Sequence, residues 1–206
     1  NTTGSYNVAV GRQALKYNTT ASNNTAVGYH ALQVNTTGQY NTAVGSGALD
    51  SVTTATQVVG VGYQAGHTIT TGSNNVAIGS ETLINLTTGS NNTAVGIASL
   101  RSMTGSYNTG LGTFAGYHST SSTGYNTLIG AHAGFGASGS TTANYVTAVG
   151  ESAARLITTA NFTTALGYAA GYDLTSGTQN TFVGAYAGTN ITSAPSNTAI
   201  GYYALA

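Results

Sequence analysis

Charged residues are scarce in this chain. It has four Lys or Arg and four Asp or Glu among 206 residues, which is 4 %, whereas a typical soluble domain has about 25 %. The two signs cancel, so the formal net charge at pH 7 is +0. No electrostatic field is available to attract nucleic acid or an anionic membrane. We therefore expect neither nucleic-acid binding nor membrane insertion, and a surface made of neutral hydroxyl and amide groups.

Cysteine is absent and proline occurs once. The chain can therefore form neither a disulfide framework nor a thiolate metal site. No apolar run approaches the roughly 20 residues that span a bilayer, and the first residues carry no signal-peptide pattern. Low charge can indicate disorder, but 40 % of the residues are hydrophobic and Thr and Val are abundant, which favours a folded chain.

What the sequence does have is a repeat of about 17 residues. It is marked by one glycine in each of twelve copies, and we call these residues the marker glycines and number the coils after them. The marker glycines are Gly11, Gly28, Gly45, Gly62, Gly79, Gly96, Gly112, Gly130, Gly150, Gly167, Gly184 and Gly201. We interpret residues 1–206 as one repeat array, and because it starts and stops within a repeat we expect it to be a segment of a longer fibre.

The residues before each marker glycine predict a strand. An aliphatic residue always precedes the glycine, as in Val27 and Val44, and the position two residues earlier is always Val or Thr. Apolar or β-branched residues at every second position have the period of a strand. Asn lies four residues before the glycine in nine copies, and stacked coils are expected to join these amides in a ladder.

The rest of the unit completes a coil. The third residue after the glycine is always small, the fourth is Leu, Gly or once Ala, and a Thr-rich pair such as Thr36-Thr37 follows. We predict a second short strand at the Thr pair, with the three length changes in a loop before it, because loops tolerate insertions. The sequence thus predicts an all-β, parallel β-solenoid of twelve coils, stacked at about 4.8 Å into a rod of roughly 55–60 Å.

Charged and histidine side chains occupy one part of every coil. All of them lie one to six residues after a marker glycine, so we expect one wet edge and a neutral remainder. One aliphatic and one Leu or Gly position per coil make a thin core, and packing chains together would bury more apolar area. This favours self-association as a homotrimer or filament.

The unit Asn-Thr-Ala-Val-Gly-x-x-Ala-Leu is complete at Asn24–Leu32 and Asn41–Leu49, and Val76–Gly79 reads Val-Ala-Ile-Gly. It resembles the head repeats of trimeric autotransporter adhesins and the repeat arrays of phage tail fibres, over the whole chain. The resemblance implies a parallel β-roll, a homotrimer, and a shaft or adhesive head outside the cell, on a cell surface or on a virion. The adhesin repeat is usually a few residues shorter.

Catalysis has little support in the sequence. Glu151 and Asp173 are the one conceivable carboxylate pair, and they lie five positions out of register in adjacent coils. His30 and His132 sit in a Gly-x-His-Ala context that resembles a hexapeptide acyltransferase, but that fold needs three hexapeptides per coil and this unit has one. They are also six coils apart, too far to share a metal ion. We predict no enzyme activity, no cofactor and no metal site.

Two binding alternatives remain open. The Thr pairs suggest an ice-binding ladder, although adjacent strand residues face opposite sides and only one of each pair could point outward. Tyrosines suggest either glycan contact or a stacked ladder that stiffens the rod. The candidates for glycan contact are Tyr29, Tyr63, Tyr168 and Tyr202, which directly follow marker glycines, and the candidates for glycan attachment are the sequon residues Asn18 and Asn35 before the Thr pair.

Overall fold

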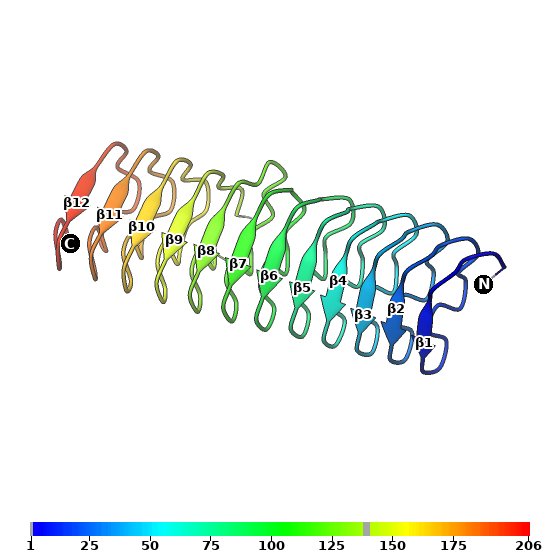
Figure 1. Cartoon of the computed structure of the whole chain (residues 1–206). Coiled ribbons are helices and arrows are strands. Elements are labelled where there is room, and N and C mark those ends of the chain that lie inside the picture. The colour runs from blue at the N-terminus through cyan, green and yellow to red at the C-terminus, as the bar shows by residue number, and fades with distance from the viewer. Residues whose placement is uncertain (1, 138–140) are drawn as a thin grey trace.

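The computed structural model describes residues 2–137 and 141–206, and within these ranges the chain is a parallel β-solenoid without helices (Figure 1). Each coil contributes one three-residue strand, and the strands lie in a single sheet in chain order. The predicted solenoid is therefore confirmed. The strands are β1 (Val8–Val10), β2 (Thr25–Val27), β3 (Thr42–Val44), β4 (Val59–Val61), β5 (Val76–Ile78), β6 (Thr93–Val95), β7 (Thr109–Leu111), β8 (Thr127–Ile129), β9 (Thr147–Val149), β10 (Thr164–Leu166), β11 (Thr181–Val183) and β12 (Thr198–Ile200).

Equivalent residues of neighbouring coils pair in register. Thr25 pairs with Thr42, and the three irregular steps keep the same alignment, since Thr93, Thr109, Thr127 and Thr147 pair in succession. Side chains at equivalent positions therefore stack in columns that run along the rod. Both the core and the surface of the molecule consist of such columns.

The sheet faces the opposite way from the sequence prediction. The middle residue of a strand, usually Ala, points inward and is buried, as in Ala26 and Ala94. The flanking Thr and aliphatic residues point outward, and Val44 and Ile78 are 37 % and 38 % exposed. The aliphatic column before the marker glycine, predicted to belong to the core, is therefore on the surface. At the centre of most strands the inward side chain is therefore only a methyl group, and the larger buried side chains come mainly from other segments of the coil.

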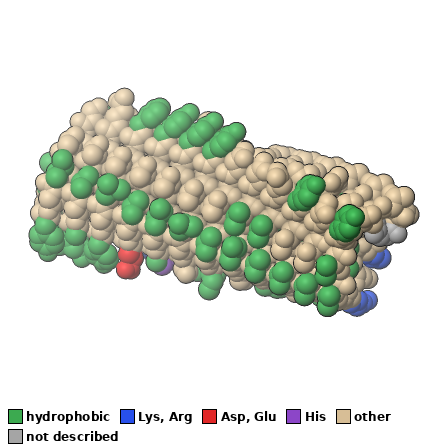
Figure 2. All heavy atoms as spheres, in the orientation of Figure 1, with side chains coloured by type: hydrophobic (Ala, Val, Ile, Leu, Met, Phe, Trp, Pro, Cys, Tyr) green, Lys and Arg blue, Asp and Glu red, His purple; other side chains and the backbone are tan. Residues whose placement is uncertain are grey.

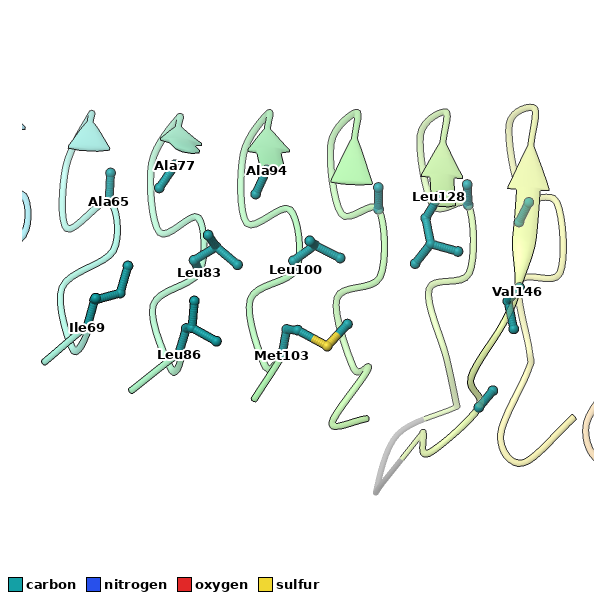
Figure 3. Packing of buried hydrophobic residues seen from close by; sticks show 14 of the residues in the cluster. Ala65, Ile69, Ala77, Leu83, Leu86, Ala94, Leu100, Met103, Leu128 and Val146 are labelled. Carbon is teal, nitrogen blue, oxygen red and sulfur yellow. The ribbon is translucent and has the colours of Figure 1, made fainter. Parts of the chain in front are cut away.

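The core is built from columns of the coil's other segments (Figure 3). Leu83 and Leu100 form one column, and Leu86 and Met103 form another beside it, all completely buried. The small residues three positions after the marker glycine, such as Ala65, close the interior. A single chain thus encloses a continuous core of its own, and more columns contribute to it than the one aliphatic and one Leu or Gly position per coil that the sequence indicated.

The column four residues after the marker glycines, which we call the inner column, holds Leu in some coils and Gly in others. The reason is that the central residue of the neighbouring strand varies in size. Phe182 stands in the middle of β11, where most strands have Ala, and glycines lie on both sides of it. A Cβ on Gly171 would lie 2.7 Å from Phe182 Cδ2, and one on Gly188 only 2.4 Å from Phe182 Cδ1. Leu128 in β8 has the same relation to Gly134. Where the strand centre carries a large side chain, the inner column carries glycine, so that the interior stays densely packed.

The marker glycines meet two separate requirements. Their φ angles lie between 119° at Gly96 and 138° at Gly28, a region essentially reserved for glycine. A Cβ on Gly96 would also lie 2.7 Å from the carbonyl carbon and oxygen of Gly112 in the next coil. The chain leaves each strand through this turn, and no other residue fits the backbone angle and the space together.

The predicted Asn ladder is confirmed. The side-chain oxygen of Asn24 accepts a hydrogen bond of 2.9 Å from the backbone N–H of Asn41, and Asn7 stands in the same relation to Asn24. The amide nitrogen of Asn41 donates to the carbonyl of Ala55 at 2.8 Å, and Ala55 is the counterpart of Gly38 in the following coil. Asn41 therefore bonds to the following coil through both side-chain atoms, since its oxygen also accepts from the backbone N–H of Val58.

The Thr pair is not a strand, which corrects a second expectation. One member is joined to the next coil by backbone and side-chain hydrogen bonds, for example from Thr36 Oγ1 to the carbonyl of Thr53 at 3.0 Å, but the segment is a bend rather than an extended strand. Among the described residues, the only strand-like pairing near this position is one isolated parallel β-bridge between Ser119 and Thr141. The pair acts as a hydrogen-bonded corner.

Two of the three length changes also lie elsewhere than predicted. Gly89 faces Gly105, and Gly105 faces Ser121 and Ser122. The one-residue deletion therefore falls between Met103 and Gly105, at the Thr corner, and the one-residue insertion follows that corner in the next coil. The three-residue insertion precedes Thr141, as predicted, although residues 138–140 lie outside the described residues.

Candidate functional site: the outer face and the charged edge

The outer face of the sheet is a uniform surface that runs along all twelve strands. We define it by the first and third residue of each strand, so that it consists of a Thr-rich column beside a column of Val, Ile and Leu. No Lys, Arg, Asp or Glu belongs to either column. Figure 2 shows hydrophobic side chains along the whole length of the visible face, with Lys, Arg, Asp and Glu only at its lower margin. This surface is long, regular, neutral and only partly covered.

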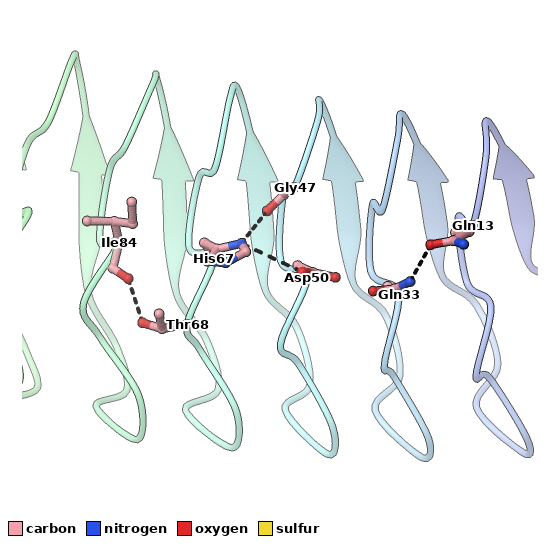
Figure 4. A network of polar contacts seen from close by, with 7 residues as sticks. All are labelled: Gln13, Gln33, Gly47, Asp50, His67, Thr68 and Ile84. Atoms are coloured by element: carbon pink, nitrogen blue, oxygen red, sulfur yellow. Dashed lines mark hydrogen bonds and ion pairs between the residues drawn. The ribbon is translucent and has the colours of Figure 1, made fainter.

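The charged edge consists of the residues one to six positions after the marker glycines. Here the columns change from coil to coil, and neighbours two and five positions after the glycine interact across the coil boundary (Figure 4). Gln33 donates to Gln13 Oε1 at 2.8 Å. His67 Nδ1 lies 3.2 Å from the carbonyl of Gly47 and 3.9 Å from Asp50 Oδ2. Arg101 Nε donates to Glu81 Oε2 at 3.1 Å.

The four tyrosines predicted to contact glycans are exposed on this edge but do not form a row. Tyr29 and Tyr63 lie two coils apart with Ser46 between them, and Tyr168 and Tyr202 are likewise separated by Ala185. Tyr29, Tyr168 and Tyr202 have local aromatic partners instead. Tyr29 stacks on His30 at 3.8 Å, and Tyr168 meets Tyr186 edge to face at 5.1 Å.

A true aromatic row lies five residues before the marker glycines. Tyr107, Tyr125, Tyr145 and Phe162 stack nearly parallel, with centroid separations of 5.1, 5.4 and 4.9 Å. Because each ring covers the face of the next, the row presents ring edges to solvent. This arrangement has the form of the stiffening ladder that the sequence left as an alternative, and it offers few ring faces on which a sugar could stack.

Asn18 and Asn35 are buried, contrary to their expected place in an open loop. Asn35 donates to the carbonyl of Gly38 at 2.9 Å and accepts from its N–H at 3.1 Å. Asn18 donates to the carbonyl of Ala21 at 3.1 Å. The folded rod therefore does not present these two amides to a glycosylating enzyme.

In the Thr pairs of coils 2–4 the first member is half-buried and hydrogen-bonded and the second is exposed, although the segment is a bend and not a strand with alternating faces. The hydroxyls of Thr36, Thr53 and Thr70 donate to carbonyls of the following coil at 3.0 to 3.2 Å. Their neighbours, such as Thr37 and Thr54, are exposed. One outward hydroxyl per coil remains at this corner, and a second Thr column lies on the outer face.

The residues considered for catalysis do not form a shared site among the described residues. Neither Glu151 nor Asp173 has a cationic partner there. His132 packs against Phe114 at 5.5 Å and His30 against Tyr29. Within the described ranges no cavity is found and no group of three or more His, Cys, Asp or Glu could hold a metal ion. No helix long and apolar enough to cross a membrane occurs there either.

Sequence reasoning missed two features of this surface. It placed the aliphatic column inside, although the almost constant Ala at the strand centre indicated which side faces the narrow interior. It also missed a column of Arg and aromatic residues in coils 6–10, which holds Arg101, Tyr117, Phe135, Arg155 and Tyr172. Their common offset of five from the marker glycine was the available signal.

Comparison with known proteins adds no relative. No family model, no curated protein and no solved structure matches the chain.

Proposed function

We propose that this protein is a non-enzymatic structural and adhesive fibre whose rods associate side by side, as a homotrimer or filament, outside the cell or on a virion. The observation that carries the proposal is the outer face. It runs along all twelve strands, contains no charged residue, and leaves branched aliphatic side chains partly exposed. Large uncharged apolar surfaces of this kind usually mark interaction sites.

Two further features support a structural role. All the charged residues lie on the charged edge. This edge can stay in contact with water when the outer faces of neighbouring rods pack together. A rod whose core, Asn ladder and Thr corner repeat in every coil also extends to any length without changing its cross-section. Neither feature requires a small-molecule site.

The oligomeric state in solution tests the proposal. We expect the purified chain to sediment as a trimer or larger species, and substitution of Val44 and Ile78 by Asp to shift it toward monomer while its circular dichroism is retained. Thr54→Asp, at an exposed corner position, is the matched control and should leave the assembly unchanged. A stable monomer, or an assembly indifferent to Val44→Asp and Ile78→Asp, contradicts side-by-side association.

Ice binding is the second candidate, because the outer face also carries a straight Thr column. Thr is the first strand residue in nine of the twelve coils, at a repeat of about 4.8 Å, and its neighbour column is flat and aliphatic. The two functions use the same face and exclude each other there. A monomeric chain with thermal hysteresis that disappears in Thr42→Lys would support ice binding, whereas an oligomer without hysteresis supports the fibre.

A further inference from the structure

The charged edge of coils 6–10 differs from the rest of the rod. In the buried columns residue changes are limited to those whose volume a neighbouring column offsets, as Phe182 is offset by Gly171 and Gly188. The column five residues after the marker glycine is free of that constraint, and in these coils it holds Arg101, Tyr117, Phe135, Arg155 and Tyr172 in succession. A variable surface on a constant scaffold is where a repeat protein can encode recognition.

These five side chains form one continuous stack. Tyr117 and Phe135 lie parallel, with centroids 5.4 Å apart and an interplanar angle of 9°. The Arg101 guanidinium lies 5.4 Å from the Tyr117 centroid, and that of Arg155 lies 5.5 Å from Phe135 and 5.6 Å from Tyr172. The ring faces are therefore covered by neighbours in the stack. Their edges, which carry the positive part of the aromatic quadrupole, are left for a ligand.

The two arginines of the stack differ in charge compensation. Arg101 is paired with Glu81 at 3.1 Å. Arg155 forms no ion pair with any described residue, and its Nη1 donates to the hydroxyl of Tyr172. Its Nε is buried without a hydrogen-bond partner. Turning this guanidinium toward a ligand would cost one hydrogen bond and would give the unsatisfied Nε an acceptor.

We propose that the surface around Arg155 binds a sugar ring that carries a carboxylate. The planar guanidinium fork matches a carboxylate in two parallel hydrogen bonds, and positive ring edges beside it favour sugar oxygens over apolar groups. No cavity encloses the described residues here, so the ligand would lie along the edge as a saccharide chain does. The inference rests on the adhesive role proposed above, and it identifies acidic saccharides as the class of ligand that such a fibre would bind.

Binding of defined oligosaccharides to the full chain tests the inference. The probes are sialyllactose and a hyaluronan tetrasaccharide, which carry the carboxylate on different sugars, and lactose as the neutral counterpart. We expect at least one acidic probe to bind in biolayer interferometry and lactose not to bind. Arg155→Gln should weaken the acidic probe by tenfold or more, and Arg155→Lys should weaken it less.

Arg12→Gln is the matched control, because Arg12 also lies over a tyrosine, Tyr29 at 5.6 Å, but in the first coil. The Arg12→Gln variant should bind the acidic probe with unchanged affinity. Equal binding of lactose, unaltered affinity in folded Arg155→Gln, or no binding of either acidic probe overturns the inference. Such a result in a chain that still forms trimers would leave the fibre proposal intact, whereas a monomer that binds the acidic probe would contradict the fibre alone.

Discussion

At the residue scale, glycine determines where the chain can turn. Two kinds of glycine occur, and they differ in what a side chain would meet. Gly96 has φ 119° and faces the backbone of Gly112, whereas Gly47 has φ 67° and would place a Cβ 3.4 Å from Gln64 Cγ. His30 and Gln64 occupy the same place as Gly47 in neighbouring coils, with φ of 58° and 51°. The second kind of glycine is therefore optional.

Gly96→Ala should lower the free energy of unfolding by about 3 kcal/mol or more, because it adds backbone strain of about 1–3 kcal/mol and displaces the next coil. Gly47→Ala is the control and should cost only the left-handed backbone strain of about 1–2 kcal/mol, because its Cβ would lie at ordinary contact distance from Gln64. Urea denaturation followed by circular dichroism measures both. Similar losses in the two variants would show that the fit between coils is not what selects glycine at the marker position.

His118 makes stability depend on pH. Burial lowers the pKa of its imidazole in the folded chain, and the nearby charge of Arg101 lowers that pKa further. The unfolded chain therefore binds a proton more readily near the ordinary value of about 6.5, so folding stability is greatest above that pH and falls as the pH drops through 6.5 toward the folded pKa. Below the folded pKa the loss is complete.

We expect His118→Gln to flatten the decline in melting temperature between pH 7 and pH 5. In Arg101→Gln, NMR titration should find the pKa of His118 closer to its ordinary value, although still lowered by burial. A pKa that is unchanged in Arg101→Gln would mean that the arginine's charge does not reach the imidazole.

At the scale of the element, each coil is a cross-section in which volume must balance. Phe182 in β11 is accommodated because Gly171 and Gly188 have no side chains, and Ala154 shows that the same inner column accepts a methyl group elsewhere. The outer strand residues carry no such constraint. Core substitutions should therefore be coupled in pairs, whereas outer-face substitutions in coils that are not adjacent should be independent of one another.

Phe182→Ala should destabilise the rod by about 3–5 kcal/mol through the cavity that it leaves. Gly188→Ala should also be costly, since its new Cβ would meet the ring at 2.4 Å. In the double variant the methyl group fills part of the cavity, so the combined loss should be smaller than the sum by about 1 kcal/mol or more. A thermodynamic cycle from urea denaturation measures this coupling, and strict additivity would refute it.

The repeat, the parallel solenoid, the strand and the Asn ladder could be predicted from the sequence because each depends on one offset that recurs in every coil. The orientation of the strand could not be read from hydrophobicity alone, because Val is more apolar than Ala and yet Ala is the inward residue of most strands. The Thr corner resembles a strand in composition but bends where Thr36 bonds to the next coil. Asn18 and Asn35 were misplaced because a polar residue in a loop can still face inward and satisfy its amide there.

At the scale of the whole molecule, the rod is a one-dimensional array in which each coil contacts its two neighbours. Stability should therefore be local. In Phe182→Ala we expect amide hydrogen exchange to speed up in β10–β12 while β2–β6 keep their protection. Uniform acceleration across all strands would instead show that the array unfolds as one cooperative unit.

The in-register stacking of the strands also has a consequence for diffraction. A parallel sheet that advances by one strand per coil repeats every 4.8 Å or so along the rod. Oriented specimens should give a sharp meridional X-ray reflection near that spacing, as cross-β fibrils do. The rod contains a single sheet, however, to which each coil contributes one strand. The reflection near 10 Å from stacked sheets should therefore be weak unless the outer faces of neighbouring rods pack together.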